Sequence, residues 1–314
     1  MTDRVDAVVI GRNEGTRLVA CLASLQGQVG RIVYVDSGST DGSVAAAEAA
    51  AAEVLQLDLS QPFTAARARN AGLALCDGEF VQFVDGDCTV APGWVAAGLS
   101  HLESDPGCAV VCGRRREARP EASIYNRLCD IEWDTPIGPA RACGGDALMR
   151  RGAVAALGGF DPALIAGEEP DLCLRLRAAG WHIRRLDTDM TRHDAAIHRF
   201  GQWWRRARRA GYAFAEGSAR HGAPPEKHWV AETRRALIWG LALPGVIIFG
   251  GLIWWPLALL LLLYPAQVLR LGLRSGDWDW AVFTVLGKFA EAGGALRYYA
   301  GRMAGRRSRL IEYR

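Results

Sequence analysis

The chain has 314 residues, of which 50% are hydrophobic and 23% charged, which is enough for one large folded domain or two small ones. Its formal net charge of +3 conceals an asymmetry: residues 191–314 carry 19 Lys and Arg against 8 Asp and Glu, whereas residues 1–190 carry 18 against 26. A basic part beside apolar segments favours the cytoplasmic face of a membrane. No groove-reading motif is present, so nucleic acid is not expected as a partner.

Eight cysteines lie between Cys21 and Cys173, without a C-x-x-C pair. Structural zinc sites usually need ligands clustered more tightly than this. The first residues are polar and charged and do not resemble an export signal. We therefore interpret the thiols as reduced packing residues of a cytosolic domain.

Short apolar runs alternate with polar loops and helical patterns along the first half of the chain. Strands are predicted at residues 6–10, 31–35, 54–57, 80–84 and 109–112, and helices at residues 16–25 and 65–75, with Pro92 opening a further helix. This alternation predicts an α/β fold with a mostly parallel, Rossmann-like sheet. No G-x-G-x-x-G follows the first strand and no Walker lysine is present, which weakens dinucleotide-binding and P-loop interpretations.

Two carboxylates, Asp85 and Asp87, follow the run Phe80–Val84, with Gly86 between them. Ligands of open α/β sheets bind just past the carboxyl ends of strands, and glycine lets the backbone come close to them. Two hard oxygen ligands at this place suit Mg²⁺ or Mn²⁺, which in turn holds phosphate oxygens. An Asp-Gly-Asp turn without a metal is the alternative.

A set of motifs in this order resembles the family 2 glycosyltransferases of the GT-A fold. The motifs are Asn13-Glu14, Val35–Gly42, Ala68–Gly72, Val84–Asp87, Gly144–Arg151 and Gly167–Cys173. Two positions depart from the usual pattern, because Asp146 stands where Asn is commoner and Glu168-Glu169 replaces Glu-Asp. Each motif is weak by itself, and their order across residues 8–180 carries the resemblance.

The resemblance implies a role for each motif. Glu169 is the expected general base, and Asp85 and Asp87 are the expected ligands of a divalent metal. Contacts with the nucleotide-diphosphate sugar or the acceptor are expected from Asn13, Glu14, Asp36, Ser39, Arg69, Asp85, Gly145 and Asp146. Alternatives remain open for several of these residues: Asp36 and Asp41 as turn or cap residues, Arg69 as a structural ion pair, and Glu168 and Asp171 as charges favoured at a helix N-terminus.

Two further features follow the base motif. In the resembling enzymes a histidine at this place sometimes completes the metal site, so His193 is a third expected ligand, with a structural role as the alternative. Gln202 and Arg205 resemble the Gln-x-x-Arg-Trp motif of processive synthases, which cradles the acceptor end. Arg206 replaces the final Trp, which puts processive polymerisation in doubt. The alternative is an amphipathic helix at residues 201–220.

Residues 236–269 form a run of 34 residues without a charge. One membrane span needs about 20 residues, so this run is long for one pass and short for two. Pro244, Gly250-Gly251 and Trp254-Trp255-Pro256 interrupt it, and arginines flank both sides, which favours a hairpin with both ends in the cytoplasm. A buried helical hairpin of a soluble protein is the alternative. Residues 280–302 are amphipathic and suit a helix lying in the plane of the membrane.

The sequence thus predicts a catalytic domain at residues 1–220, a linker at 221–235, a transmembrane or re-entrant hairpin at 236–273, and an amphipathic helix with a basic tail at 274–314. The expected function is sugar transfer to a lipid-linked or membrane-proximal saccharide in cell-envelope or exopolysaccharide assembly, inverting and non-processive, at a bacterial inner membrane with the catalytic domain facing the cytoplasm. A non-catalytic relative that binds nucleotide sugar or scaffolds a synthesis complex is the second hypothesis. Joint retention of Asp85, Asp87 and Glu169 favours the enzyme. A nucleotidyltransferase is disfavoured, because a Gly-rich loop bearing Arg or Lys is missing after the first strand.

Overall fold

The computed structural model describes residues 2–305, so the predicted basic tail at residues 306–314 lies outside the described residues. The chain divides into two compact units, residues 1–196 and 197–314. Each unit is described by itself below. The helix at residues 200–221, which the sequence placed in the catalytic domain, belongs to the second unit by this division.

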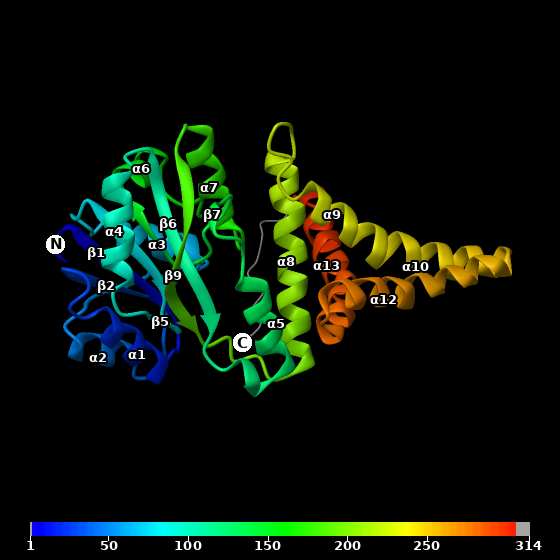
Figure 1. Cartoon of the computed structure of the whole chain (residues 1–314), viewed down its shortest axis with the longest axis horizontal. Coiled ribbons are helices and arrows are strands. Elements are labelled where there is room, and N and C mark those ends of the chain that lie inside the picture. Colours follow the sequence, from blue (N-terminus) through cyan, green and yellow to red (C-terminus); the bar gives the residue numbers. More distant parts are fainter. Residues whose placement is uncertain (1, 306–314) are drawn as a thin grey trace. The chain divides into compact units, whose positions relative to one another are not determined.

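The first unit begins with the predicted parallel sheet (Figure 1). Its strands are β1 (Val5–Gly11), β2 (Arg31–Asp36), β3 (Glu53–Gln56) and β4 (Phe80–Asp85), and its helices are α1 (Thr16–Leu25), α2 (Ser43–Ala49) and α3 (Ala65–Leu73), after the short 3₁₀ helix η1 (Thr2–Arg4). The strands pair in parallel in the order β3-β2-β1-β4, with Gly11 opposite Asp36 and Ile10 opposite Asp85. Three loops therefore leave the sheet at the same edge.

The remaining strands make the sheet mixed. They are β5 (Cys88–Val90), β6 (Cys108–Glu117), β7 (Gly138–Pro139), β8 (Ala147–Arg150) and β9 (His182–His193), with helices α4 (Trp94–Ser104), η2 (Pro120–Ala122), α5 (Ile124–Trp133), α6 (Arg151–Ala156) and α7 (Glu168–Ala178). The order continues β4-β8-β6-β9-β5, in which β8 is antiparallel to both β4 and β6. The Rossmann-like α/β prediction is confirmed, and the parallel pattern covers its first half.

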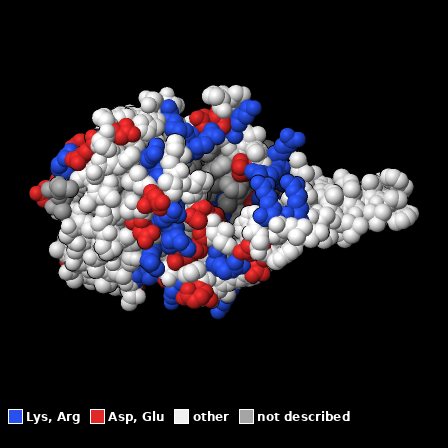
Figure 2. Space-filling model, viewed as in Figure 1, with Lys and Arg blue, Asp and Glu red and all other residues white. Residues whose placement is uncertain are grey.

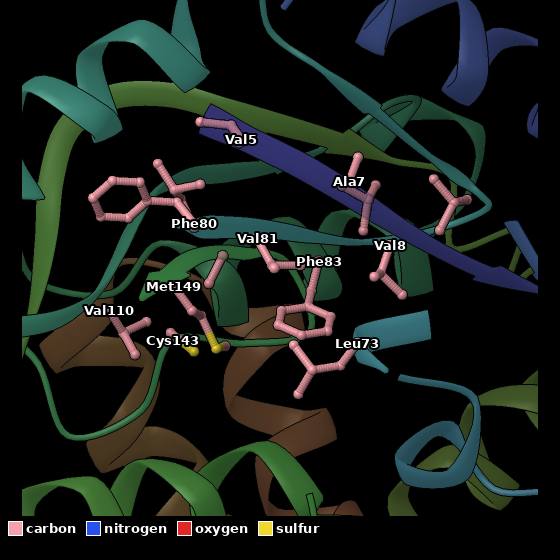
Figure 3. Packing of buried hydrophobic residues seen from close by; sticks show 14 of the residues in the cluster. Val5, Ala7, Val8, Leu73, Phe80, Val81, Phe83, Val110, Cys143 and Met149 are labelled. Atoms are coloured by element: carbon pink, nitrogen blue, oxygen red, sulfur yellow. The ribbon is translucent and has the colours of Figure 1, made fainter. Parts of the chain in front are cut away.

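The core lies on both faces of this sheet. Figure 3 shows Phe83 of β4 directed toward Leu73 of α3, and Met149 of β8 beside Val110 and Cys143. Phe83 also meets Phe160 edge to face, with ring centroids 5.2 Å apart. Residues Phe80–Val84 of β4 are buried on both sides, as their mostly apolar pattern predicts. Gln82 is polar, and its Oε1 accepts a hydrogen bond from Trp94 Nε1 at 2.8 Å.

The second unit is helical. Its elements are α8 (Phe200–His221), α9 (Val230–Leu237), η3 (Ile238–Ala242), α10 (Leu243–Gly245), η4 (Val246–Gly250), α11 (Gly251–Ile253), η5 (Trp255–Leu262), α12 (Leu263–Ser275) and α13 (Trp278–Met303). From α9 to α12 the chain forms two continuous helical arms that reverse at Trp254. We call residues 230–275 the hairpin.

The hairpin is longer than the uncharged run. Its arms span Val230–Ile253 and Trp255–Ser275, 24 and 21 residues, and each contains an 18-residue stretch apolar enough to cross a membrane. The sequence estimate was shorter because it counted only the uncharged residues, whereas the helices continue into charged ones at both ends. Figure 2 shows the projecting part of the hairpin without charged side chains, in keeping with the uncharged run at residues 236–269.

The last helix packs against α8, and its expected place in the plane of a membrane stays a prediction. α13 contacts α8 through small residues: a Cβ on Gly294 would lie 2.0 Å from Arg208 O, and one on Gly211 would lie 2.0 Å from Glu291 O. Such contacts let two helix backbones come close together. Val282 and Leu296 of the expected membrane-facing side remain 44% and 43% exposed, so α13 combines a buried small-residue face with an exposed apolar one.

Candidate active site

The loop after β4 places Asp85 and Asp87 in different surroundings. Asp85 Oδ1 accepts a hydrogen bond from Arg69 Nη2 at 2.8 Å, and Asp85 Oδ2 lies 3.7 Å from Arg115 Nη2. Asp87 Oδ2 instead lies 3.1 Å from Nε2 of His193. The sequence analysis expected both carboxylates to be metal ligands. In the structure Asp85 contacts two arginines, whereas Asp87 contacts a histidine.

His193 reaches Asp87 because β5 and β9 are paired. Cys88 of β5 lies opposite His193 at the end of β9, and Asp194 N donates to Asp87 O at 3.1 Å. The imidazole packs edge to face against Trp133, with ring centroids 4.6 Å apart. Asp87, Cys88 and His193 form one of three groups in residues 2–305 whose ligand atoms lie close enough together to hold a metal. Mn²⁺ and Mg²⁺ both bind carboxylates, but Mg²⁺ prefers oxygen ligands alone, so a site with an imidazole fits Mn²⁺ better than Mg²⁺.

Arg69 sits at the centre of a buried ionic network. Its side chain is 4% exposed and also donates to Glu168 Oε1 at 2.7 Å. Although burial alone would lower the pKa of this guanidinium, the carboxylates of Asp85 and Glu168 raise it overall. This geometry matches the structural ion pair considered above, and direct contact between Arg69 and a phosphate stays a prediction.

Arg115 was missed by the sequence analysis. It lies in the run Arg114–Arg116 of β6, where successive side chains point to opposite faces of the sheet. Arg114 and Arg116 pair with exposed or peripheral carboxylates, while Arg115 lies between Asp85 and Asp146 and over the ring of Trp133. The alternating direction of side chains along this strand is the signal that could have singled out the middle arginine.

The segment Cys143–Asp146 connects the network to the expected base. Asp146 is fully buried; its Oδ1 accepts from Asp85 N at 3.1 Å and its Oδ2 from Thr191 Oγ1 at 2.8 Å. A Cβ on Gly145 would lie only 2.7 Å from Asp85 Oδ2, so glycine is required for this close approach. Asp146 thus positions β4 from inside, and its expected contact with a substrate stays a prediction.

Glu169 lies in the first turn of α7, 6% exposed. Its Oε1 accepts hydrogen bonds from Cys143 N at 2.5 Å, Cys143 Sγ at 3.0 Å and Cys173 Sγ at 2.9 Å. Burial raises the pKa of this carboxyl, and the donors from Cys143 and Cys173 lower it in part. A carboxylate with a raised pKa is suited to proton transfer.

The loops after β1 and β2 hold each other. Asp36 is 2% exposed; its Oδ2 accepts from the amides of Gly38 and Ser39, both at 2.9 Å, and its Oδ1 from Tyr34. Ser39 Oγ accepts from Asn13 N at 2.9 Å, and Asn13 Oδ1 accepts from Thr40 N at 2.7 Å. Asp36 therefore has the turn role weighed as its alternative, and contacts of this loop with a nucleoside stay predictions.

Three other predicted residues have local roles in the structure. Glu14 pairs with Arg17 at 2.6 Å. Gln202 Oε1 accepts from the amides of His198 and Arg199, both at 3.0 Å, so it caps the start of α8. Arg205 is exposed on the same helix, in the second unit. Their expected contacts with donor or acceptor are untested.

Comparison with known proteins agrees with the resemblance to family 2 glycosyltransferases. The family model described as "Glycosyl transferase family 2" matches residues 6–154. Over 207 residues the chain is 33% identical to the pre-mycofactocin glycosyltransferase of Mycobacterium tuberculosis, an alignment that covers 60% of this chain and 42% of that relative. The chain therefore spans less than half the length of this curated relative.

Two solved structures have a similar fold. One is the mannosyltransferase PcManGT from Pyrobaculum calidifontis in complex with GDP-Man and Mn²⁺, with a TM-score of 0.66 and 23% identity, covering 94% of this chain and 88% of that chain. The other is S. aureus TarS 1–349, with a TM-score of 0.53 and 15% identity, covering 96% of this chain and 92% of that chain. At these identities the likeness concerns the fold, which is the expected GT-A arrangement of sheet and helices.

Proposed function

Residues 6–154 are a family 2 glycosyltransferase domain, and from this premise we propose that the chain moves a sugar from a nucleotide-diphosphate donor to a lipid-linked or membrane-proximal saccharide. In this proposal the transfer needs Mg²⁺ or Mn²⁺ and inverts the configuration of the donor sugar. The similar mannosyltransferase structure contains GDP-Man and Mn²⁺, which supports a nucleotide-sugar donor and a divalent ion here.

The segment Cys143–Asp146 contacts both the proposed base and the loop after β4, and this observation carries the proposal. Through Cys143 N it contacts Glu169, and through Gly145 and Asp146 it contacts Asp85. A transferase has to keep its base at a fixed separation from the donor phosphates, because a small misplacement of reacting groups costs much of the rate. A continuous strand-and-loop connection of this kind provides such a constraint.

Asp87 and His193 are the residues that would hold the divalent ion, with Asp85 nearby on the same loop. When bound, this ion supplies neutralisation of the charge on the leaving diphosphate. Arg69 and Arg115 fix the Asp85 carboxylate from both sides, so the loop keeps its shape whether or not a ligand is present.

Glu169 is the base in this proposal. With Oε1 held by three donors, the position of the carboxylate is defined, and this carboxylate would accept the proton of an acceptor hydroxyl. Its raised pKa places the carboxylate nearer to working pH than an ordinary glutamate, which strengthens it as a base. Attack by the deprotonated hydroxyl in a single displacement gives the inverted product.

Glu169→Gln tests this role. The amide keeps the volume but cannot take the proton, so turnover is expected to fall at least about a hundredfold while nucleotide binding is retained. Glu121→Gln, on the exposed turn η2, is the matched control and should leave turnover unchanged. Normal turnover of Glu169→Gln, or a product with the donor's anomeric configuration, contradicts the proposal.

The acceptor part of the proposal rests on the hairpin. Few of its side chains are buried, and apolar ones near its tip are strongly exposed, with Leu252 at 82% and Ile253 at 89%, which water does not favour. Arginines lie near both ends of the hairpin, at Arg234, Arg235, Arg270 and Arg274, where they suit anionic lipid headgroups. An enzyme anchored in this way meets acceptors at the membrane surface. Arg206 in place of the synthase Trp supports transfer of one sugar per encounter.

We further propose that both ends of the hairpin face the cytoplasm of a bacterial inner membrane, where nucleotide sugars are made. Green fluorescent protein fused after Arg314 is then expected to fluoresce, and alkaline phosphatase at the same place to be inactive. An active phosphatase together with a dark fluorescent protein would mean that the chain crosses the membrane once. Long polymer from the purified protein and a single donor would exclude non-processive transfer.

A further inference from the structure

The surroundings of Glu169 contain a second set of ligand atoms, chemically different from the set around Asp87. Cys143 Sγ and Cys173 Sγ are 3.6 Å apart, and each lies 2.9 to 3.0 Å from Glu169 Oε1. All three side chains are buried. Two sulfurs and one oxygen in contact form the donor set of a thiophilic cation, whereas Mg²⁺ prefers oxygen alone.

The positions of these residues keep the three atoms together. Cys173 follows Glu169 by four residues on α7, so both side chains lie on the same face of the helix. Cys143 approaches from the loop before β8, and its own amide donates to Glu169. None of the three atoms depends on an exposed or long side chain to reach the others.

The spacing is close to that of a tetrahedral zinc site. Zn–S bonds of about 2.3 Å at tetrahedral angles place two sulfurs about 3.8 Å apart and a sulfur and an oxygen about 3.5 Å apart. The observed sulfur pair is within a few tenths of an ångström of this, and the carboxylate would have to withdraw by about half an ångström, which rotation of a glutamate side chain provides.

We propose that Cys143, Glu169 and Cys173 bind a thiophilic divalent cation such as Zn²⁺, and that binding removes Glu169 from catalysis. The ion displaces one proton from each thiol and coordinates the two thiolates and the carboxylate, leaving a fourth position open. Because burial raises the pKa of both thiols, that of Cys173 to about 11, binding strengthens as pH rises. The inhibitory consequence rests on the proposed role of Glu169, whereas the cation site does not.

Cadmium is a direct probe, because its bond to a thiolate absorbs in the ultraviolet. Titration of the full chain in detergent with Cd²⁺ is expected to give this absorption with one ion per chain, and Zn²⁺ is expected to displace it. The double variant Cys143→Ser/Cys173→Ser should lose the absorption and bind at least about a hundredfold more weakly. The matched control Cys76→Ser/Cys129→Ser also removes two buried thiols, which belong to none of the potential metal groups in residues 2–305, and should behave as the unaltered protein. Undiminished absorption in the first variant overturns the proposal.

X-ray absorption at the zinc edge tests the unaltered protein and does not depend on how a variant folds. Two sulfur neighbours are expected for the proposed site. One sulfur neighbour would place the ion at one of the two other groups, Asp87, Cys88 and His193 or His101, Asp105 and Cys108, and none would place it on oxygen and nitrogen ligands; either result overturns the proposal.

Transfer assays separate this inference from the proposed function. In saturating Mn²⁺, added Zn²⁺ is expected to inhibit the unaltered enzyme and to spare the active fraction of the double serine variant. If zinc binds through two sulfurs without inhibiting transfer, the proposed cation site is supported and the proposed role of Glu169 as base is contradicted. If Glu169→Gln is inactive but no thiolate–cadmium band forms, the cation site falls and the proposed function stands.

Discussion

The sheet around Asp85 and the hairpin handle polarity in opposite ways. The sheet encloses charges: Arg69, Asp146 and Glu169 are all buried, and every one of them has hydrogen-bonded or ionic partners. The hairpin exposes apolar groups, among them Phe249 at 70% and Trp255 at 71%. In water a buried unpaired charge and an exposed apolar rod are both unfavourable. The first region pairs its charges with partners inside the protein, and the second has the exposed apolar surface that the proposed membrane anchor requires.

The largest expected effect breaks the charge network. Arg69→Met leaves Asp85 and Glu168 without their shared cation, which should lower the free energy of unfolding by about 3 to 5 kcal/mol, measured by urea denaturation of the full chain. Arg4→Met is the matched control, because Arg4 also joins two carboxylates, Glu79 and Glu103, but at the surface. Its removal should change stability little. Equal losses in the two variants would show that burial of the Arg69 network is not what matters.

The second effect belongs to the hairpin. Ile248→Arg places a charge in the uncharged part of the first arm, which should weaken membrane insertion by up to about 2.5 to 3.5 kcal/mol without destabilising the sheet. The membrane-bound fraction of expressed protein is the measurement. Val19→Arg, on an exposed position of α1, is the control with the same chemistry and should leave that fraction unchanged. An unchanged membrane fraction after Ile248→Arg would show that insertion of the hairpin is not what holds the protein at the membrane.

A third effect concerns the pH dependence of transfer. Glu169 acts as a base only when ionised, so kcat/KM should fall as pH drops through its folded-state pKa. Cys143→Ala removes a donor that lowers this pKa, so the acid limb of the profile should move to higher pH. Cys76→Ala should leave the limb in place. A shift to lower pH in Cys143→Ala would show that the thiol does not stabilise the carboxylate.

The smallest effect compares helix starts. Thr64 Oγ1 accepts from Arg67 N at 3.1 Å and caps α3, so Thr64→Ala should cost about 1 kcal/mol of stability, as should Ser123→Ala at the start of α5. The arms of the hairpin begin without side-chain caps. Trp229, before the first arm, makes no side-chain cap, so Trp229→Ala should not lower stability by loss of a capping hydrogen bond. A melting curve for each variant measures the difference.

Local pattern was sufficient for much of the fold. The helix Thr16–Leu25 and the strands β1, β2 and β4 were predicted within one residue, because their periodicity and their flanking polar loops are local properties. The place of Asp85 and Asp87 at the end of a strand follows from the same pattern. The antiparallel strand β8 and the long β9 were not predicted, because their pairing partners are distant in the chain.

What the sequence by itself determined is which groups are present and which strand ends carry them. Only the tertiary structure decided which of these groups contact each other. Asp85 contacts two arginines, Asp87 contacts His193, and Glu169 contacts two thiols that the sequence analysis assigned to packing. The physical reason is distance along the chain. A side chain's partner, and with it its pKa and its ligand chemistry, is set by residues that the fold brings from tens of positions away, and no periodicity or spacing in the sequence records those contacts.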